Sequence, residues 1–161
     1  MSQSALADRK TAYHDAYIEA WNDHDPDGVV EQFADGGTYV DPLFEEPIGG
    51  EEIAEFVRLT AERFPDFRFE QRHVLDVPEE SIRIEEWTMH GTHEGMREGL
   101  PPTGNTIALD GTSVVEIGAG GIREIRGYYD QKELAEQLGL TFPAVVGQLP
   151  TMVVGAAKEV L

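Results

Sequence analysis

Residues 87–106 read WTMHGTHEGMREGLPPTGNT, and the expected fold follows from this stretch. A segment with the two-residue periodicity of a strand, 81–93, leads into a loop rich in glycine and proline, and a second such segment, 105–117, follows the loop. The pattern indicates two neighbouring strands. The loop between them, 94–105, is either a lid over a pocket or only a long hairpin connection.

The same periodicity continues outward from this pair. We expect further strands at 67–76 and 122–129, a tight hairpin at 118–121 where the chain reads GAGG, and a short strand at 38–41. Capping residues, proline and helical periodicity predict helices at 5–22, from Asp25 onward, from Gly50 to about Phe64, and from Asp130 to Leu138. Helices followed by a run of strands predict one α+β domain over residues 1–140, with a curled antiparallel sheet.

The charge of the chain limits its partners. Thirty-one acidic residues against twelve basic ones give a formal net charge of −19. Such a surface repels nucleic acid and anionic membranes, so we expect neither as a partner. At about 1 M salt the Debye length is roughly 3 Å and the self-repulsion is screened, which favours a halophilic source over an acidic mesophilic one. The chain has no cysteine, which excludes disulfides and thiol nucleophiles.

The two ends of the chain also carry information. The first ten residues, MSQSALADRK, contain no apolar segment, which predicts a cytoplasmic protein without a signal peptide. Residues 141–161 are apolar, but proline and glycine interrupt them, so they do not form a membrane span. We expect this C-terminal extension to pack on a partner subunit or near a pocket mouth, or alternatively on its own domain.

Several blocks carry a resemblance to a known family. They are WNDHDPD (21–27), FADGGTYVDP (33–42), FPDF (64–67), GTHEG (91–95), PPTG (101–104) and GGIREIRGYYD (120–130). In this order and spacing, over about residues 10–140, the chain resembles the SnoaL-like polyketide cyclase family. The resemblance implies a nuclear-transport-factor-like cone, in which the sheet closes around a small-molecule pocket. It also implies ring closure by intramolecular aldol condensation, without metal or cofactor.

The family's catalytic groups do not carry over to this chain. The resemblance implies an aspartate in the last strand and a histidine in the strand beside it. An ungapped alignment around the GGI of 120–122 places these positions on Gly127 and Ser113. Glycine cannot carry a proton, although Gly127 would leave room for a ligand, and Ser113 would supply only a weak hydrogen bond. Other residues must therefore supply any acid–base chemistry.

Asp41, His93 and Tyr129 are the candidate catalytic residues. Asp41 ends a strand beside Tyr39, and either serves as a base or caps a turn before Pro42. His93 shares a strand face with Trp87 and Met89, and is either a base or a structural histidine bonded to backbone. Tyr129 lies on the expected pocket side, and either holds a substrate oxygen or fills the core.

Further residues are candidates for lining the pocket. We expect Trp21, Tyr39, His73, Trp87, Met89, Ser113 and Gly127 to contact a ligand. His90 lies on the opposite strand face from His93, so the two do not form a metal pair, and we expect neither a metal nor a cofactor.

The leading hypothesis is a homodimeric enzyme that dimerises through the outer sheet face. It would perform cofactor-free aldol cyclisation, isomerisation or hydration on a small, largely apolar carbonyl compound. The alternatives are a non-catalytic binder of the same fold and a dimeric interaction module.

Overall fold

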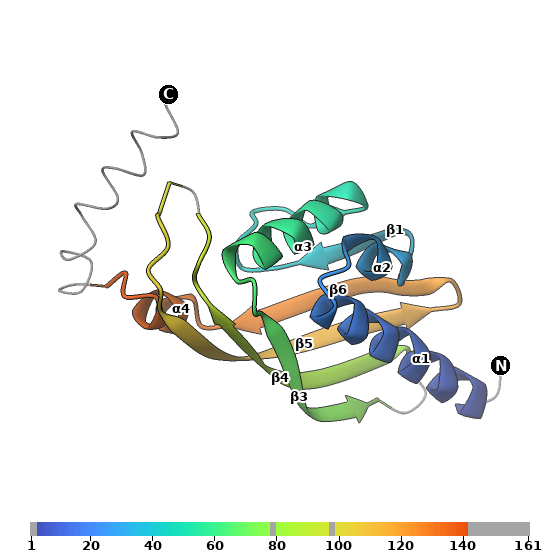
Figure 1. Ribbon diagram of the computed structural model, residues 1–161. Coiled ribbons are helices and arrows are strands. Elements are labelled where there is room, and N and C mark those ends of the chain that lie inside the picture. Colours follow the sequence, from blue (N-terminus) through green and yellow to red (C-terminus); the bar gives the residue numbers. More distant parts are fainter. Residues whose placement is uncertain (1–2, 78–79, 97–98, 142–161) are drawn as a thin grey trace.

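The computed structural model describes residues 3–77, 80–96 and 99–141. Three helices, α1 (Gln3–Asn22), α2 (Pro26–Glu31) and α3 (Glu51–Arg63), cover one face of a curved sheet, and α4 (Gln131–Gln137) lies at one end of it (Figure 1). The strands are β1 (Phe33–Val40), β2 (Ile48–Gly49), β3 (Arg68–Asp76), β4 (Ile82–Thr92), β5 (Thr106–Gly118) and β6 (Gly121–Tyr129). The α+β class with N-terminal helices is therefore confirmed.

The sheet has the strand order β2-β1-β6-β5-β4-β3. Its long neighbours β3 to β6 are antiparallel, as the alternating sequence predicted. One pairing is the exception in this mostly antiparallel sheet: β1 pairs parallel with β6 and aligns Tyr39 with Ile125. On its other side β1 pairs antiparallel with the short β2, which follows it in the chain and leads into α3. β1 is also longer than the predicted strand at 38–41.

Local sequence signals account for the helix boundaries. Asp25 caps α2 by accepting a hydrogen bond from the backbone N–H of Gly28 at 3.0 Å. Asp130 caps α4 by accepting from the N–H groups of Lys132 and Glu133. Both caps satisfy N–H groups that have no partner within the helix. Asp130 thus has the structural role that its sequence context favoured.

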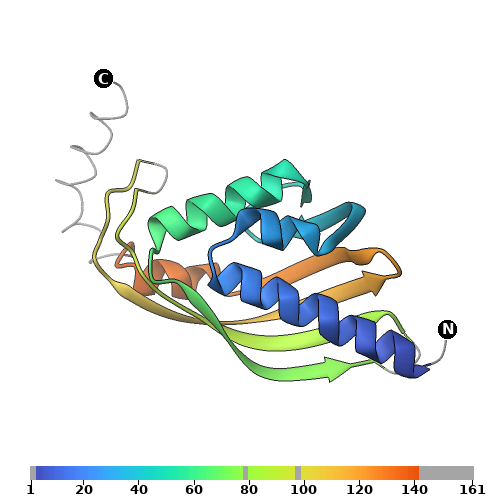
Figure 2. The ribbon, with the colours of Figure 1, turned by 45° about the vertical axis from the view of Figure 1, so that its right-hand side comes forward.

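The core lies between the helices and the concave face of the sheet (Figure 2). Trp21 of α1 makes edge-to-face contacts with Phe56, Phe67 and Phe69, whose ring centroids lie 5.6 to 5.7 Å away. This geometry places the positive edge of one ring against the negative face of another, which stabilises aromatic clusters beyond simple burial. An aromatic cluster therefore joins the first helix to the third helix and to β3.

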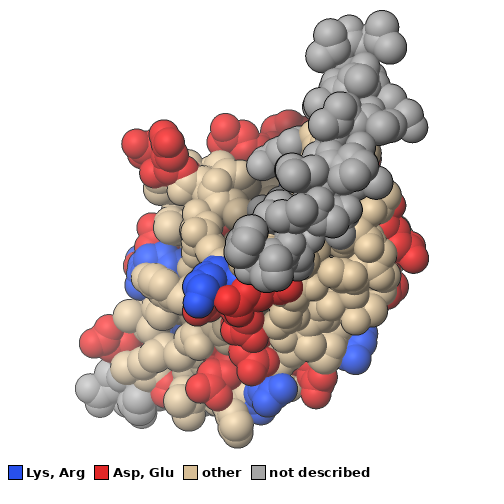
Figure 3. Space-filling model, turned by 90° about the vertical axis from the view of Figure 1, so that its left-hand side faces the viewer, with Lys and Arg blue, Asp and Glu red and all other residues tan. Residues whose placement is uncertain are grey.

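No helix in the described part of the chain is long and apolar enough to cross a membrane. Apart from Thr141, the apolar C-terminal extension lies outside the described residues, and the expectation for its packing stays a prediction. Acidic side chains are spread over the face in Figure 3, with few basic side chains between them.

Salt should stabilise this protein. With a net charge of −19, the folded chain repels itself, and salt screens that repulsion. We expect the Tm to rise between about 0.01 and 0.5 M NaCl, where the Debye length falls from roughly 30 Å to a few ångströms. Differential scanning calorimetry in a NaCl series measures this. A flat Tm across the series would contradict the prediction, and an equal osmolality of sorbitol is the uncharged control.

Candidate active site

A cavity of about 70 Å³ lies between the helices and the concave face of the sheet. Its walls are mostly aromatic, and they include Trp21, Phe56, Phe67, Phe69, Trp87 and Tyr129. Tyr39, Met89 and Asp41 also line it. Of the ten residues singled out from the sequence, six therefore meet at one cavity: Trp21, Tyr39, Asp41, Trp87, Met89 and Tyr129. An apolar cavity with few polar groups is the usual make-up of a small-molecule site.

Asp41 is the acidic residue of this cavity wall, at the end of β1. The residue is 4% exposed. Oδ1 accepts hydrogen bonds from the Tyr129 hydroxyl at 2.8 Å and from the backbone N–H of Leu43 at 2.9 Å. Oδ2 accepts from the Tyr39 hydroxyl at 3.4 Å. Asp41 therefore caps the turn, as one interpretation proposed, and it also presents a carboxylate to the cavity.

Tyr39 remains a hydrogen-bond donor over the whole working pH range. Burial raises its pKa well above the ordinary tyrosine value, and the nearby Tyr17 and Asp41 raise it further. Its hydroxyl therefore keeps its proton beside the carboxylate. Tyr129, on the neighbouring strand β6, reaches the same carboxylate, while the next side chain along, Tyr128, is 54% exposed on the other face.

Ser113 and Gly127, which we expected to contact a ligand, are not among the residues that line the cavity. Ser113 accepts a hydrogen bond from the indole N–H of Trp87 at 2.9 Å, so it holds the wall in place. Gly127 lies beside the carboxylate, since a Cβ built there would be 3.6 Å from the Tyr39 hydroxyl and 3.9 Å from Asp41 Oδ2. Neither residue is among those that line the cavity, but Ser113 bonds to one of them.

His93 is completely buried at the end of β4, and it is not among the residues that line the cavity. Its Nδ1 accepts from the backbone N–H of Thr103 at 3.3 Å and lies 3.2 Å from the Thr103 hydroxyl. Its ring also packs on Phe64 at 5.5 Å. These contacts match the structural interpretation of His93, a histidine bonded to backbone where the strand meets the loop.

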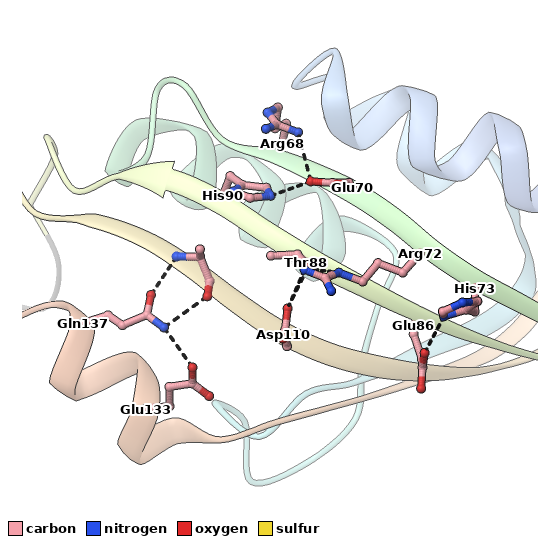
Figure 4. A network of polar contacts seen from close by, with 11 residues as sticks. Arg68, Glu70, Arg72, His73, Glu86, Thr88, His90, Asp110, Glu133 and Gln137 are labelled. Atoms are coloured by element: carbon pink, nitrogen blue, oxygen red, sulfur yellow. Dashed lines mark hydrogen bonds and ion pairs between the residues drawn. The ribbon is translucent and has the colours of Figure 1, made fainter.

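The expectation that His73 lines the pocket was wrong. Its side chain is 74% exposed on the outer face of β3, where it bonds to Glu86 at 2.8 Å (Figure 4). The register between β3 and β4 shifts between Gln71 and His73, and this irregularity breaks the simple alternation on which the expectation rested. His90 lies on the same outer face and bonds to Glu70 (Figure 4). The described residues form no group that could hold a metal.

Sequence reasoning missed two features of the interior. Arg63, at the end of α3, lines the cavity, although it reads as an ordinary basic residue in the last turn of a helix. His14 and Glu85 form a hydrogen-bonded pair, 0% and 2% exposed, between α1 and β4. One sequence feature pointed to this pair. Glu85 lies two residues before Trp87, so strand alternation predicts that it faces the interior of the protein.

Fold and site together define a class: an α+β cone with a small aromatic pocket that bears a carboxylate. A family model described as SnoaL-like polyketide cyclase matches residues 11–138. The chain belongs to this family. No curated protein sequence matches it significantly.

Solved structures agree with this assignment. A candidate polyketide cyclase from Xanthomonas campestris is 25% identical, with a TM-score of 0.71 over 83% of this chain and 98% of that one. A candidate hydroxylase from Streptomyces galilaeus is 20% identical, with a TM-score of 0.72 over 84% and 98%. A Catenulispora acidiphila protein with a ketosteroid isomerase-like fold, solved with trimethylamine, is 20% identical, with a TM-score of 0.68 over 82% and 94%. The last two show the fold alone.

Proposed function

We propose that this protein catalyses cofactor-free acid–base chemistry on a small, largely apolar carbonyl compound, with Asp41 as the base. The observation that carries the proposal is the buried Asp41 carboxylate, which faces an apolar cavity and accepts a hydrogen bond from Tyr129 at 2.8 Å. A carboxylate with few water contacts is well placed to remove a proton next to a carbonyl group. Aldol cyclisation and isomerisation begin with such a step, and hydration of an unsaturated ketone ends with its reverse, in which the enolate carbon takes a proton back from the carboxyl group.

The position of Asp41 supports the proposal further. The family resemblance puts an aspartate at the position of Gly127, where a Cβ would lie 3.9 Å from Asp41 Oδ2. Because β1 and β6 are paired, Asp41 brings a carboxylate to the same part of the cavity from the neighbouring strand. The glycine leaves the space that this arrangement needs.

In the proposed reaction, one C–H bond of the substrate breaks and its proton passes to Asp41. The electron pair moves onto the carbonyl oxygen, which becomes an enolate. Once Asp41 is protonated, the Tyr129 hydroxyl can turn from the carboxyl group to donate to that oxygen. Return of the proton to another carbon gives isomerisation. Attack of the enolate on a second carbonyl gives cyclisation, with Asp41 then protonating the new alkoxide. His93 keeps a structural role at the base of the loop.

The test is exchange of α-protons of cyclopentanone and cyclohexanone in D₂O, followed by proton NMR. Wild-type protein should accelerate the exchange, and Asp41→Asn should lower the rate by about 10²-fold or more, because the amide cannot accept the proton. Asp110→Asn is the matched control, since Asp110 is an exposed aspartate on the outer face of β5 that contacts Thr88 and Arg72. Exchange that is equally fast with Asp41→Asn would reject the role of Asp41.

A second candidate function is binding of a small methylated amine without chemistry. Among the described residues that line the cavity, eight are aromatic, and Asp41 adds a negative charge. Rings around a carboxylate suit a substituted ammonium ion, which the faces of aromatic rings attract. Titration calorimetry compares the affinity of the protein for trimethylammonium chloride with its affinity for the neutral analogue tert-butanol. Tighter binding of the cation, in a protein that does not accelerate the ketone exchange, favours the binding function.

A further inference from the structure

A groove lies next to the cavity, between α3 and the segment that joins β1 to β2. Its volume is about 610 Å³, whereas that of the cavity is about 70 Å³. The segment before α3 lines the groove with Leu43, Phe44 and Ile48. Pockets that enclose drug-sized ligands measure roughly 300 to 1,000 Å³. The groove therefore has the volume of a ligand site, and the cavity alone does not.

The spacing of residues along α3 explains why this side of the helix is partly apolar. Four residues that line the groove follow one another at intervals of four, three and four, which places them on one side of a helix: Glu52, Phe56, Leu59 and Arg63. Ile53, by contrast, is fully buried in the core. Phe56 and Leu59 are only half-buried, so they leave apolar surface in the groove.

The groove and the cavity have a common boundary. Among the described residues, both are lined by Leu43, Phe56 and Arg63. The Phe56 ring makes an edge-to-face contact with Trp21 of the cavity wall at 5.7 Å, and another with Phe44 of the groove wall at 5.1 Å. A ligand longer than the cavity would therefore pass these residues and enter the groove.

The charges along the groove favour a ligand with an uncharged chain. Glu51, Glu52 and Glu55 all line the groove. Arg58 lines it too, but its guanidinium donates hydrogen bonds to Glu51 and Glu55, which balance its charge. Arg63 lies at the boundary with the cavity instead. With a net charge of −19 on the whole chain, this surface repels a carboxylate at the far end of a ligand.

We propose that the cavity and the groove form one elongated substrate site, which takes an open-chain ketone with an uncharged apolar chain. The carbonyl group and its α-carbon lie in the cavity beside Asp41, and the chain passes Leu43 and Phe56 into the groove. This inference rests on the proposed function, because it names the substrate class of the same site. Leu59 is then a specificity-determining residue, since it lines the groove but not the cavity.

The experiment measures the Kd of methyl ketones from 2-butanone to 2-octanone, by following backbone amide signals of the full chain in ¹H–¹⁵N NMR spectra. Each added CH₂ group that enters the groove should lower the Kd by about two- to four-fold. The longer ketones should also shift the amide signals of 43–48 and of α3 more than 2-butanone does. A Kd that stays constant from 2-pentanone onward would overturn the proposal.

A pair of variants locates the site of the added affinity. Leu59→Gln puts an amide into the groove wall without adding a charge, and it should weaken binding of 2-octanone by roughly three- to ten-fold. Leu75→Gln is the matched control, because Leu75 is 64% exposed on β3 and is not among the residues that line the groove. The control should leave the Kd of 2-octanone unchanged. Equal affinities of the two variants for 2-octanone would reject the groove as the site of the chain.

A charged ligand of the same length tests the assignment of an uncharged chain. 7-Oxooctanoate carries a carboxylate at the far end, so it should bind about ten-fold more weakly than 2-octanone. Tighter binding of the keto acid would overturn that assignment. All these measurements are made without turnover. Exchange of cyclopentanone without any gain along the methyl ketones would reject this inference alone, and the gain without exchange would reject the proposed function alone.

Discussion

Replacing His14 with alanine should lower the free energy of unfolding by about 1 to 3 kcal/mol, the cost of leaving a buried polar group without its hydrogen-bond partner. The loss arises because Glu85 is 2% exposed and would lose its histidine partner in the core. Chemical denaturation at pH 7 measures it. The double variant His14→Leu with Glu85→Leu should recover much of the loss, because it leaves no buried charge behind.

A matched pair on the same sheet provides the control. His73 and Glu86 form a histidine–glutamate contact between β3 and β4 with side chains 74% and 58% exposed. Water already solvates both groups, so His73→Ala should change stability by less than about 1 kcal/mol. If His14→Ala and His73→Ala lower the free energy of unfolding equally, burial gives the His14–Glu85 pair no additional contribution to stability, and the prediction fails.

Replacing Gly111 with alanine should displace the Trp87 ring and destabilise the fold by about 1 to 3 kcal/mol, as overpacking of a core does. A Cβ at position 111 would lie 2.2 Å from the nearest carbon of that ring, far inside van der Waals contact. The ring forms part of the cavity wall and is tethered to Ser113, so it moves only by breaking that hydrogen bond or by entering the cavity. Denaturation and tryptophan fluorescence measure both effects.

Gly120→Ala is the control for this substitution. The nearest heavy atom to a Cβ at position 120 is 3.9 Å away, which is ordinary contact, so the change should leave stability and fluorescence nearly unaltered. Unchanged tryptophan emission in Gly111→Ala would mean that the wall tolerates the extra methyl group, and would reject the predicted displacement.

The elements that sequence reasoning located correctly are those governed by local chemistry. Asp25 and Asp130 cap helices because their side chains reach backbone groups two or three residues away. The alternation along β4 placed Trp87 and Met89 toward the interior, where both line the cavity. Such features depend on periodicity and on nearest neighbours, which a single sequence contains.

The errors came where distant segments meet or where the alternation breaks. His73 turned outward because the β3–β4 register shifts just before it. His14 and Glu85 are 71 positions apart, and although strand alternation places Glu85 on the inner face, the sequence around it does not identify His14 as its partner. For the same reason, the parallel pairing of β1 with β6 was not foreseen, since two segments that alternate alike give no sign of their relative direction.

That parallel pairing determines when the pocket comes into existence. Tyr129 and Asp41 are 88 residues apart, and β6 lies inside the sheet, between β1 and β5. During synthesis, the first three helices and β1 emerge long before the strand on which β1 must pair. Until β6 is made, this part of the chain has one unpaired strand edge and exposed aromatic side chains, the kind of surface that makes folding intermediates aggregate. Closing so long a loop also slows folding relative to local hairpins. The carboxylate site is thus among the last parts of the molecule to form, and a truncated chain that ends before β6 has Asp41 and most of the aromatic wall but lacks Tyr129, which bonds to that carboxylate.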